Sequence, residues 1–150
     1  IETNQTKIIA NPNCRKMLNR GQEMKNGDVL QLAKDIKLEA VPAYNTTPGR
    51  DKFHPKGRDN GYILTLGETR IYIAGDTEDI PELNQVKDID IAFLPVNQPY
   101  TMTPEQAIRA AKIIKPRVLY PYHYGETDIH KVKEGLKNET GTEVRIRALQ

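Results

Sequence analysis

Two apolar stretches of this chain are each followed by a side chain that could bind a metal ion. Residues 71–75 lead to Asp76, and residues 118–122 lead to His123. If both stretches are strands of one open α/β sheet, their carboxyl ends meet at the edge where such sheets keep their binding sites. A carboxylate and an imidazole placed there could share one divalent ion, which would activate a water molecule for attack on a carbonyl or phosphoryl centre.

Two protein ligands are fewer than the three or four that usually hold zinc. Asn45 and Asn97 also follow apolar stretches and would stand near the same edge, and His54 is the other nearby imidazole. Each residue also has an ordinary explanation, because asparagine and aspartate are common in turns and a histidine can be satisfied at the edge of a core. The residues alone leave both interpretations open.

The segment between residues 46 and 60 is the most basic part of the chain. It has no hydrophobic periodicity, and loops of about 15 residues are uncommon in compact domains unless they act as lids or binding loops. A solvated surface loop is the alternative interpretation. As a binding loop it would favour a small anionic substrate through its basic side chains, which are Arg50, Lys52, His54, Lys56 and Arg58.

Patterns in the rest of the chain predict an α/β (α+β) fold. Alternating apolar and charged residues over 36–44 are typical of a half-buried strand, and the nearly continuous apolar run 89–96 is typical of a buried one. Thr103, Pro104 and Gln106 mark a helix start, and the pair Lys115-Pro116 ends that helix. The predicted strands are 7–10, 28–32, 36–44, 61–66, 70–74, 89–96, 118–122 and 142–148, and the predicted helices are 12–19, 79–86 (a short helix or turn), 103–115 and 129–136.

Length and composition favour a single globular domain. The chain has 150 residues, of which 28% are charged and 37% are hydrophobic. Its net charge of +2 gives no electrostatic footprint for nucleic acid, and no apolar run is long enough to cross a membrane. The single cysteine, Cys14, excludes an intrachain disulfide and fits a reducing compartment, so we expect a cytoplasmic protein.

Six motifs of the chain follow one another in a set order. They are Val41-Pro42-Ala43-Tyr44-Asn45, the basic loop, Gly75-Asp76-Thr77, Ala92-Phe93-Leu94-Pro95-Val96, Thr101-Met102-Thr103-Pro104-Glu105-Gln106-Ala107 and Tyr120-Pro121-Tyr122-His123-Tyr124. In this order the chain resembles the metallo-β-lactamase-fold hydrolases. Within them it is most similar to the branch of metal-dependent hydrolases that contains the ascorbate-6-phosphate lactonases. The resemblance covers residues 7–148.

The resemblance implies a four-layer αββα sandwich with metal ions at the edge between two sheets. It implies that Asp76 bridges two metal ions and that His123 binds one of them. Zinc is the expected ion, with manganese or iron as alternatives. The remaining candidates are expected to line the site of a small-molecule substrate, and they are Asn45, His54, Arg58, Asn97 and Tyr124.

The chain departs from the family pattern in two ways. The family signature His-x-His-x-Asp-His does not occur, and Asn45 stands where the family usually has a histidine. An asparagine oxygen is a poorer zinc ligand than an imidazole, so the resemblance implies one metal ion, or a harder ion such as manganese, unless His54 compensates. Since the chain also starts at Ile1, we expect residues 1–150 to be a single domain, the C-terminal half of such a hydrolase, inactive without its N-terminal half.

Two other functions also fit the sequence. The first is a non-catalytic binding or assembly module, in which a sheet face left uncovered is completed by a second copy or by a partner. The second is a metal-free α/β domain that binds a small anion through Arg50, Lys52, Lys56 and Arg58. Metal analysis of protein purified without chelators separates the second function from the hydrolase.

Overall fold

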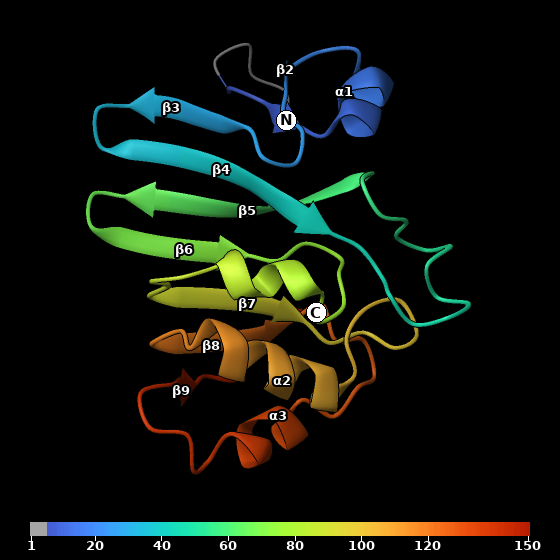
Figure 1. Cartoon of the computed structure of the whole chain (residues 1–150), viewed down its shortest axis with the longest axis vertical. Helices are drawn as coiled ribbons and strands as arrows, with labels where there is room; N and C mark the ends of the chain where they lie inside the picture. The colour runs from blue at the N-terminus through green and yellow to red at the C-terminus, as the bar shows by residue number, and fades with distance from the viewer. Residues whose placement is uncertain (1–5) are drawn as a thin grey trace.

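The computed structural model describes residues 6–150 as a mixed α/β fold built on one large sheet (Figure 1). Within these residues the large sheet has seven strands in the order β3-β4-β5-β6-β7-β8-β9. They are β3 (Val29–Ala33), β4 (Ile36–Ala43), β5 (Asp59–Leu66), β6 (Thr69–Ile73), β7 (Ile91–Pro95), β8 (Val118–Tyr122) and β9 (Glu143–Val144). Pairing is antiparallel from β3 to β6 and parallel from β6 to β9. The predicted fold class is confirmed.

A small unit beside β3 begins the described part of the chain (Figure 1). Strands β1 (Ile9–Ala10) and β2 (Gln22–Glu23) pair in parallel around helix α1 (Pro12–Leu18). Asn11 caps this helix, because its side chain accepts a hydrogen bond from the Cys14 amide at 2.8 Å.

Helical segments cover one face of the large sheet in Figure 1, namely η1 (Pro81–Gln85), α2 (Pro104–Ile114) and α3 (His130–Gly135). Core side chains come from both layers and include Tyr72, Leu83, Leu94, Ala107, Leu119 and Val132. Burying a large apolar side chain contributes about 1.5–3 kcal/mol. This packing therefore fixes β6, β7 and β8, the strands that lead to the candidate site.

The opposite face of the large sheet is apolar but only half-buried. Strand register aligns its residues in rows, such as Leu38, Leu64 and Ile71. The rings of Phe93 and Tyr120 stack on this face with their centroids 5.2 Å apart. We call this surface the open face, and its residues are Leu38, Tyr62, Leu64, Ile71, Ile73, Ile91, Phe93, Val118, Tyr120 and Tyr122.

Most predicted elements are confirmed, and the differences lie at their ends. The predicted strand 142–148 is shorter, because β9 pairs with β8 only at Val118 and Leu119 before the chain turns away. The predicted loop 46–60 ends earlier, because Asp59 and Asn60 already pair with β4. The predicted strand 7–10 is reduced to Ile9–Ala10. No helix within residues 6–150 is long and apolar enough to cross a membrane.

Candidate metal centre

Asp76 lies just beyond the carboxyl end of β6, in a position that two glycines make possible. Gly75 has φ +68°, and a Cβ atom there would stand 2.7 Å from the Asn60 carbonyl oxygen. A Cβ atom on Gly61 would stand 2.5 Å from the Ala74 carbonyl oxygen. Only glycine fits at both places, so the backbones of β5 and β6 approach closely and the Asp76 carboxylate is presented at the sheet edge.

His123 occupies the corresponding position after β8. Its φ of +45° is left-handed, which is unusual for a residue with a side chain and is typical of functional sites. The His123 amide donates to the Leu149 carbonyl at 2.7 Å, which holds this conformation. The ring Nε2 lies 3.7 Å from Asp76 Oδ1, and Asn97 Nδ2 lies 3.5 Å from the same ring atom.

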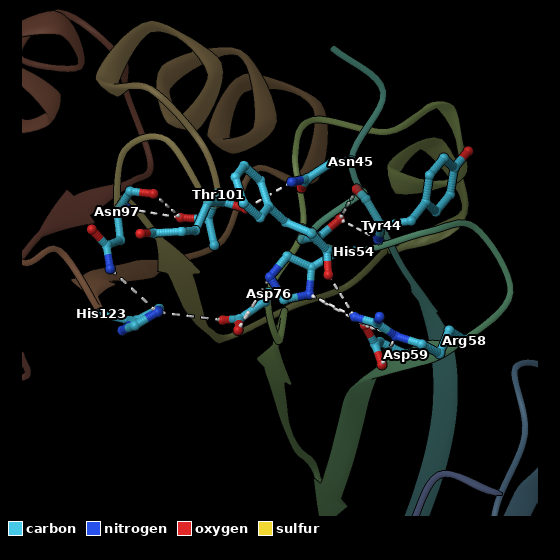
Figure 2. Close-up of polar contacts among 12 residues, drawn as sticks. Tyr44, Asn45, His54, Arg58, Asp59, Asp76, Asn97, Thr101 and His123 are labelled. Atoms are coloured by element: carbon cyan, nitrogen blue, oxygen red, sulfur yellow. Dashed lines mark hydrogen bonds and ion pairs between the residues drawn. The ribbon is translucent and has the colours of Figure 1, made fainter. Parts of the chain in front are cut away.

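His54 reaches the other oxygen of the Asp76 carboxylate from the basic loop. Its Nε2 lies 3.6 Å from Asp76 Oδ2. Figure 2 shows the rings of His54 and His123 on either side of Asp76. Asp76 and His123 lie at one edge of the sheet, as predicted. The fold of the loop also brings His54 next to Asp76.

The spacing of these groups suits a bound metal ion. A nitrogen and an oxygen 3.6–3.7 Å apart are too distant for a strong hydrogen bond. Zinc–ligand distances of about 2.0–2.2 Å place neighbouring ligand atoms about 3.3–3.5 Å apart. Within residues 6–150, however, no three histidine, cysteine, aspartate or glutamate side chains lie close enough together to hold one metal ion. The two imidazoles instead contact different oxygens of the Asp76 carboxylate.

Two charged residues, Asp59 and Arg58, lie beside the ring of His54. His54 Nδ1 lies 3.2 Å from Asp59 Oδ2, and Arg58 Nη2 donates to the same oxygen at 2.7 Å. Burial alone would raise the pKa of Asp59, but hydrogen bonds from Arg58 and His54 outweigh it and hold the pKa below its usual value. Asp59 and Arg58 therefore both lie against the Nδ1 edge of the His54 ring, while Nε2 faces the Asp76 carboxylate.

Tyr122 borders the site from the open face. Burial raises the pKa of its hydroxyl, and the negative charge of Asp76 raises it further. Tyr122 is therefore a neutral hydrogen-bonding group beside the carboxylate rather than a source of negative charge.

The other predicted site residues occupy different surroundings. Asn45 is 3% exposed, and its Nδ2 donates to the carbonyls of Arg50 at 3.1 Å and Tyr100 at 2.7 Å. Arg58 contacts His54 and Asp59, so it acts through the loop. The Tyr124 hydroxyl donates to the Arg147 carbonyl at 3.4 Å, near the C-terminal segment. Substrate contact by these residues stays a prediction.

Internal carboxylates pair with the cations of the basic loop. Arg50 pairs with Glu78 at 3.1 Å, and Lys56 pairs with Glu82 at 2.9 Å. Arg58 pairs with Asp59, as described above. The first two pairs tie the loop to Glu78, after β6, and to η1, whereas Lys52 lies over the ring of Phe53 at 5.2 Å.

Sequence reasoning missed two residues that build the site. Glu78 is fully buried and accepts hydrogen bonds from Thr46 and Thr47, and Asp59 orients His54. The available signals were a second carboxylate two positions after Asp76, and an aspartate five positions after a histidine. Neither signal identifies the residues that Glu78 and Asp59 contact, because those contacts depend on the fold of the loop.

Comparison with known proteins identifies the family of the chain. A family model described as the beta-lactamase superfamily domain matches residues 3–124. A crystal structure from Parabacteroides distasonis, described as a candidate metal-dependent hydrolase, is 61% identical, with a TM-score of 0.96 over 100% of this chain and 68% of that chain. This chain belongs to the beta-lactamase superfamily. The resemblance drawn from the sequence motifs is confirmed.

More distant members of the superfamily agree. A protein of Pelotomaculum thermopropionicum named UPF0173 metal-dependent hydrolase is 29% identical over 74% of this chain and 54% of the relative. Igni18, described as a metallo hydrolase of Ignicoccus hospitalis, has the same fold with a TM-score of 0.80 and 24% identity, over 96% of this chain and 66% of that chain. The chain thus spans about half the length of the first curated relative.

Proposed function

We propose that this chain carries part of the active site of a metal-dependent hydrolase. The observation that best supports the proposal is the position of the Asp76 carboxylate after β6, between the imidazole of His123 after β8 and that of His54 in the β4–β5 loop. The names of the curated relatives support the same activity. In this proposal Asp76 and His123 are metal ligands, and the ion is zinc, with manganese or iron as alternatives.

The side chains have distinct tasks in the proposed reaction. A bound divalent ion would supply a coordinated water of nearly neutral pKa, the nucleophile for an ester, lactone or phosphoester bond of a small molecule. Asp76 contributes negative charge at the sheet edge, and His123 presents Nε2 from a backbone held by Leu149. Asn97 is placed to orient substrate, because its amide lies next to the His123 ring.

We propose further that residues outside this chain complete the site. Three possible ligand side chains are gathered within residues 6–150, and they do not close around one point. The open face supports the same idea, since a contiguous apolar sheet face that stays partly exposed is typical of a surface that another layer covers. A missing N-terminal half or a second copy of the chain could supply that layer.

The test uses the complete protein and the substitution Asp76→Asn. We expect this variant to lose its bound metal and its activity on bis(p-nitrophenyl) phosphate or a simple lactone, because the amide replaces a charged ligand with a neutral one. Metal content is measured by inductively coupled plasma mass spectrometry. The control is Asp88→Asn at an exposed turn position. Full metal content in Asp76→Asn would contradict the proposal.

A further inference from the structure

We propose that a cavity between η1 and strands β4, β5 and β6 is a second binding site. Its ligand is a small uncharged molecule with an apolar body and one oxygen that accepts hydrogen bonds. The cavity lies on the face of the large sheet that the helical segments cover, whereas the candidate metal centre lies beyond the carboxyl end of β6. This inference goes beyond the proposed function and does not depend on it.

The cavity forms where the helical layer ends. Figure 1 shows η1, α2 and α3 in front of the sheet, and among the described residues no helical segment lies in front of β3 and β4. Strand register places Glu39, Ile63 and Tyr72 in one row across β4, β5 and β6, and this row lines the cavity. The volume of the cavity is about 210 Å³.

Most of the wall is aliphatic. Ile63 of β5 and both Ile80 and Leu83 of the η1 segment line the cavity, and each is at most 3% exposed. An apolar protein cavity of about 150 Å³ can stay free of water and bind benzene. The volume of about 210 Å³ therefore suits one ring with a short substituent.

Two polar atoms of the lining residues lack a hydrogen-bond partner within residues 6–150. They are Arg70 Nε and the Tyr72 hydroxyl, and both are buried. Burial raises the pKa of the Tyr72 hydroxyl, so this group stays protonated and can donate. Both residues lie on the same face of β6, two positions apart. Buried donors are nearly always paired in native proteins, so the two orphans indicate that an acceptor is missing.

The charges of the lining favour a neutral ligand. Arg70 Nη1 donates to Glu39 Oε2 at 3.3 Å, and Lys37 Nζ lies 2.7 Å from the same oxygen. Burial alone would raise the pKa of Glu39, but Lys37 and Arg70 outweigh it and hold the pKa below its usual value. The charge of Arg70 is therefore already matched by Glu39, and Asp28 adds a further acidic group to the lining. A carbonyl oxygen suits this wall better than a carboxylate.

The Arg70 side chain can adjust to such a ligand. It is 26% exposed, and its printed ion pair uses Nη1, which leaves Nε for another acceptor. The competing explanation is that the cavity holds only water. Binding of small probes separates the two explanations.

We would titrate the complete protein with acetophenone, ethylbenzene and benzoate and follow its backbone amide signals by NMR. The three probes each carry one ring and have similar sizes, but they present a carbonyl oxygen, no polar atom and a negative charge. Tyr72→Phe removes one orphan donor and keeps the ring, and Val41→Phe fills the cavity from β4. Tyr100→Phe is the matched control, because Tyr100 is 45% exposed and lies outside the cavity.

We expect acetophenone to bind the wild type with a Kd below about 1 mM, within the range that ligands of this size reach. Ethylbenzene and benzoate should bind about 10-fold more weakly, because neither offers a neutral acceptor to the two donors. Tyr72→Phe should weaken acetophenone binding by about 3–10-fold, the usual effect of one neutral hydrogen bond, and leave ethylbenzene binding unchanged. Val41→Phe should bind no probe, and Tyr100→Phe should match the wild type.

The absence of amide shifts with acetophenone at its solubility limit would overturn the inference. Equal affinity of the wild type and Val41→Phe for acetophenone would also overturn it, because the probe would then bind elsewhere. Circular dichroism verifies that each variant is folded. If Val41→Phe does not fold, Tyr72→Phe still decides, since acetophenone affinity equal to that of Tyr100→Phe would overturn the assigned hydrogen bond. None of these results changes the metal content that tests the proposed function.

Discussion

Glu78 is the single residue on which the loop of the candidate site depends most. Its side chain is fully buried beside Arg50, and one of its oxygens accepts hydrogen bonds from the backbone and hydroxyl groups of Thr46 and Thr47. Burial alone would raise the pKa of Glu78, but these hydrogen bonds outweigh it and keep the pKa below its usual value. The native protein therefore holds an ionised carboxylate in its interior.

Replacing Glu78 with Gln should destabilise the metal-free protein by about 3 kcal/mol, because the charge of Arg50 loses its buried partner. Urea unfolding followed by circular dichroism measures this difference in the free energy of unfolding. Glu68→Gln in the exposed β5–β6 turn is the control, and it should change stability by less than about 0.5 kcal/mol. Equal stability of Glu78→Gln and the wild type would contradict the anchoring role.

The difference in stability between the wild type and Glu78→Gln should also depend on pH. The folded pKa of Glu78 lies below the unfolded value of 4.5, so its contribution is complete above that pH and is lost as the pH falls through the folded pKa. The gap in stability between the wild type and Glu78→Gln should therefore narrow below about pH 4.5, because a protonated glutamate resembles glutamine.

At the scale of single residues, part of the candidate site could be predicted from the sequence. Asp76 and His123 could be placed because each follows an apolar run, and the ends of parallel strands meet. The position of the His54 ring could not be predicted, because it depends on Asp59, on Glu78 and on an irregular loop without periodicity. The sequence also did not reveal that the Asn45 side chain donates to the carbonyls of Arg50 and Tyr100, and its predicted place in the lining of the site stays a prediction.

At the scale of elements, α2 shows how local signals define a structure. The Thr103 side chain accepts a hydrogen bond from the Gln106 amide, and the Gln106 side chain accepts one from the Thr103 amide. Lys115 ends the helix in a left-handed conformation with φ +54°. The sequence predicted both ends, because caps and prolines act within a few residues. The ends of β1, β5 and β9 differed, because strand ends depend on distant partners.

Thr103→Ala should destabilise the protein by about 1 kcal/mol, since it removes the acceptor at the start of α2. Thr140→Ala, at an exposed position after α3, provides the control and should leave the midpoint of urea unfolding unchanged. The loss should appear without any change in metal content, because α2 packs on the sheet and not on the candidate site. An equal midpoint for both variants would show that the capping box contributes nothing.

At the scale of the whole molecule, the open face is the dominant feature. Helices bury one side of the large sheet, and half-buried aliphatic and aromatic residues form the other side. An uncovered sheet face was expected from the family resemblance, because half of a sandwich leaves one face of its sheet without a partner layer. Strand alternation indicated which residues would share it, but it did not reveal the stacked pair Phe93 and Tyr120.

Residues 1–150 produced alone should self-associate and bind a hydrophobic dye through the open face. Phe93→Lys should reduce both effects, because it places a charge at the centre of that surface. Met17→Lys is the control, since Met17 is 86% exposed but lies on α1, away from the open face. Light scattering and dye fluorescence are the measurements. A monodisperse monomer that binds no dye would contradict the expectation.

The position of Asp76 between two imidazoles also has a thermodynamic consequence. His54, Asp76 and His123 come from three segments that are distant in the chain and that meet only when it is folded. An ion held at Asp76 and His123, as proposed above, would bind the native state alone, so each tenfold rise in free ion above the dissociation constant would add about 1.4 kcal/mol to the free energy of unfolding. The melting temperature of the protein would then rise with the concentration of free metal ion around it.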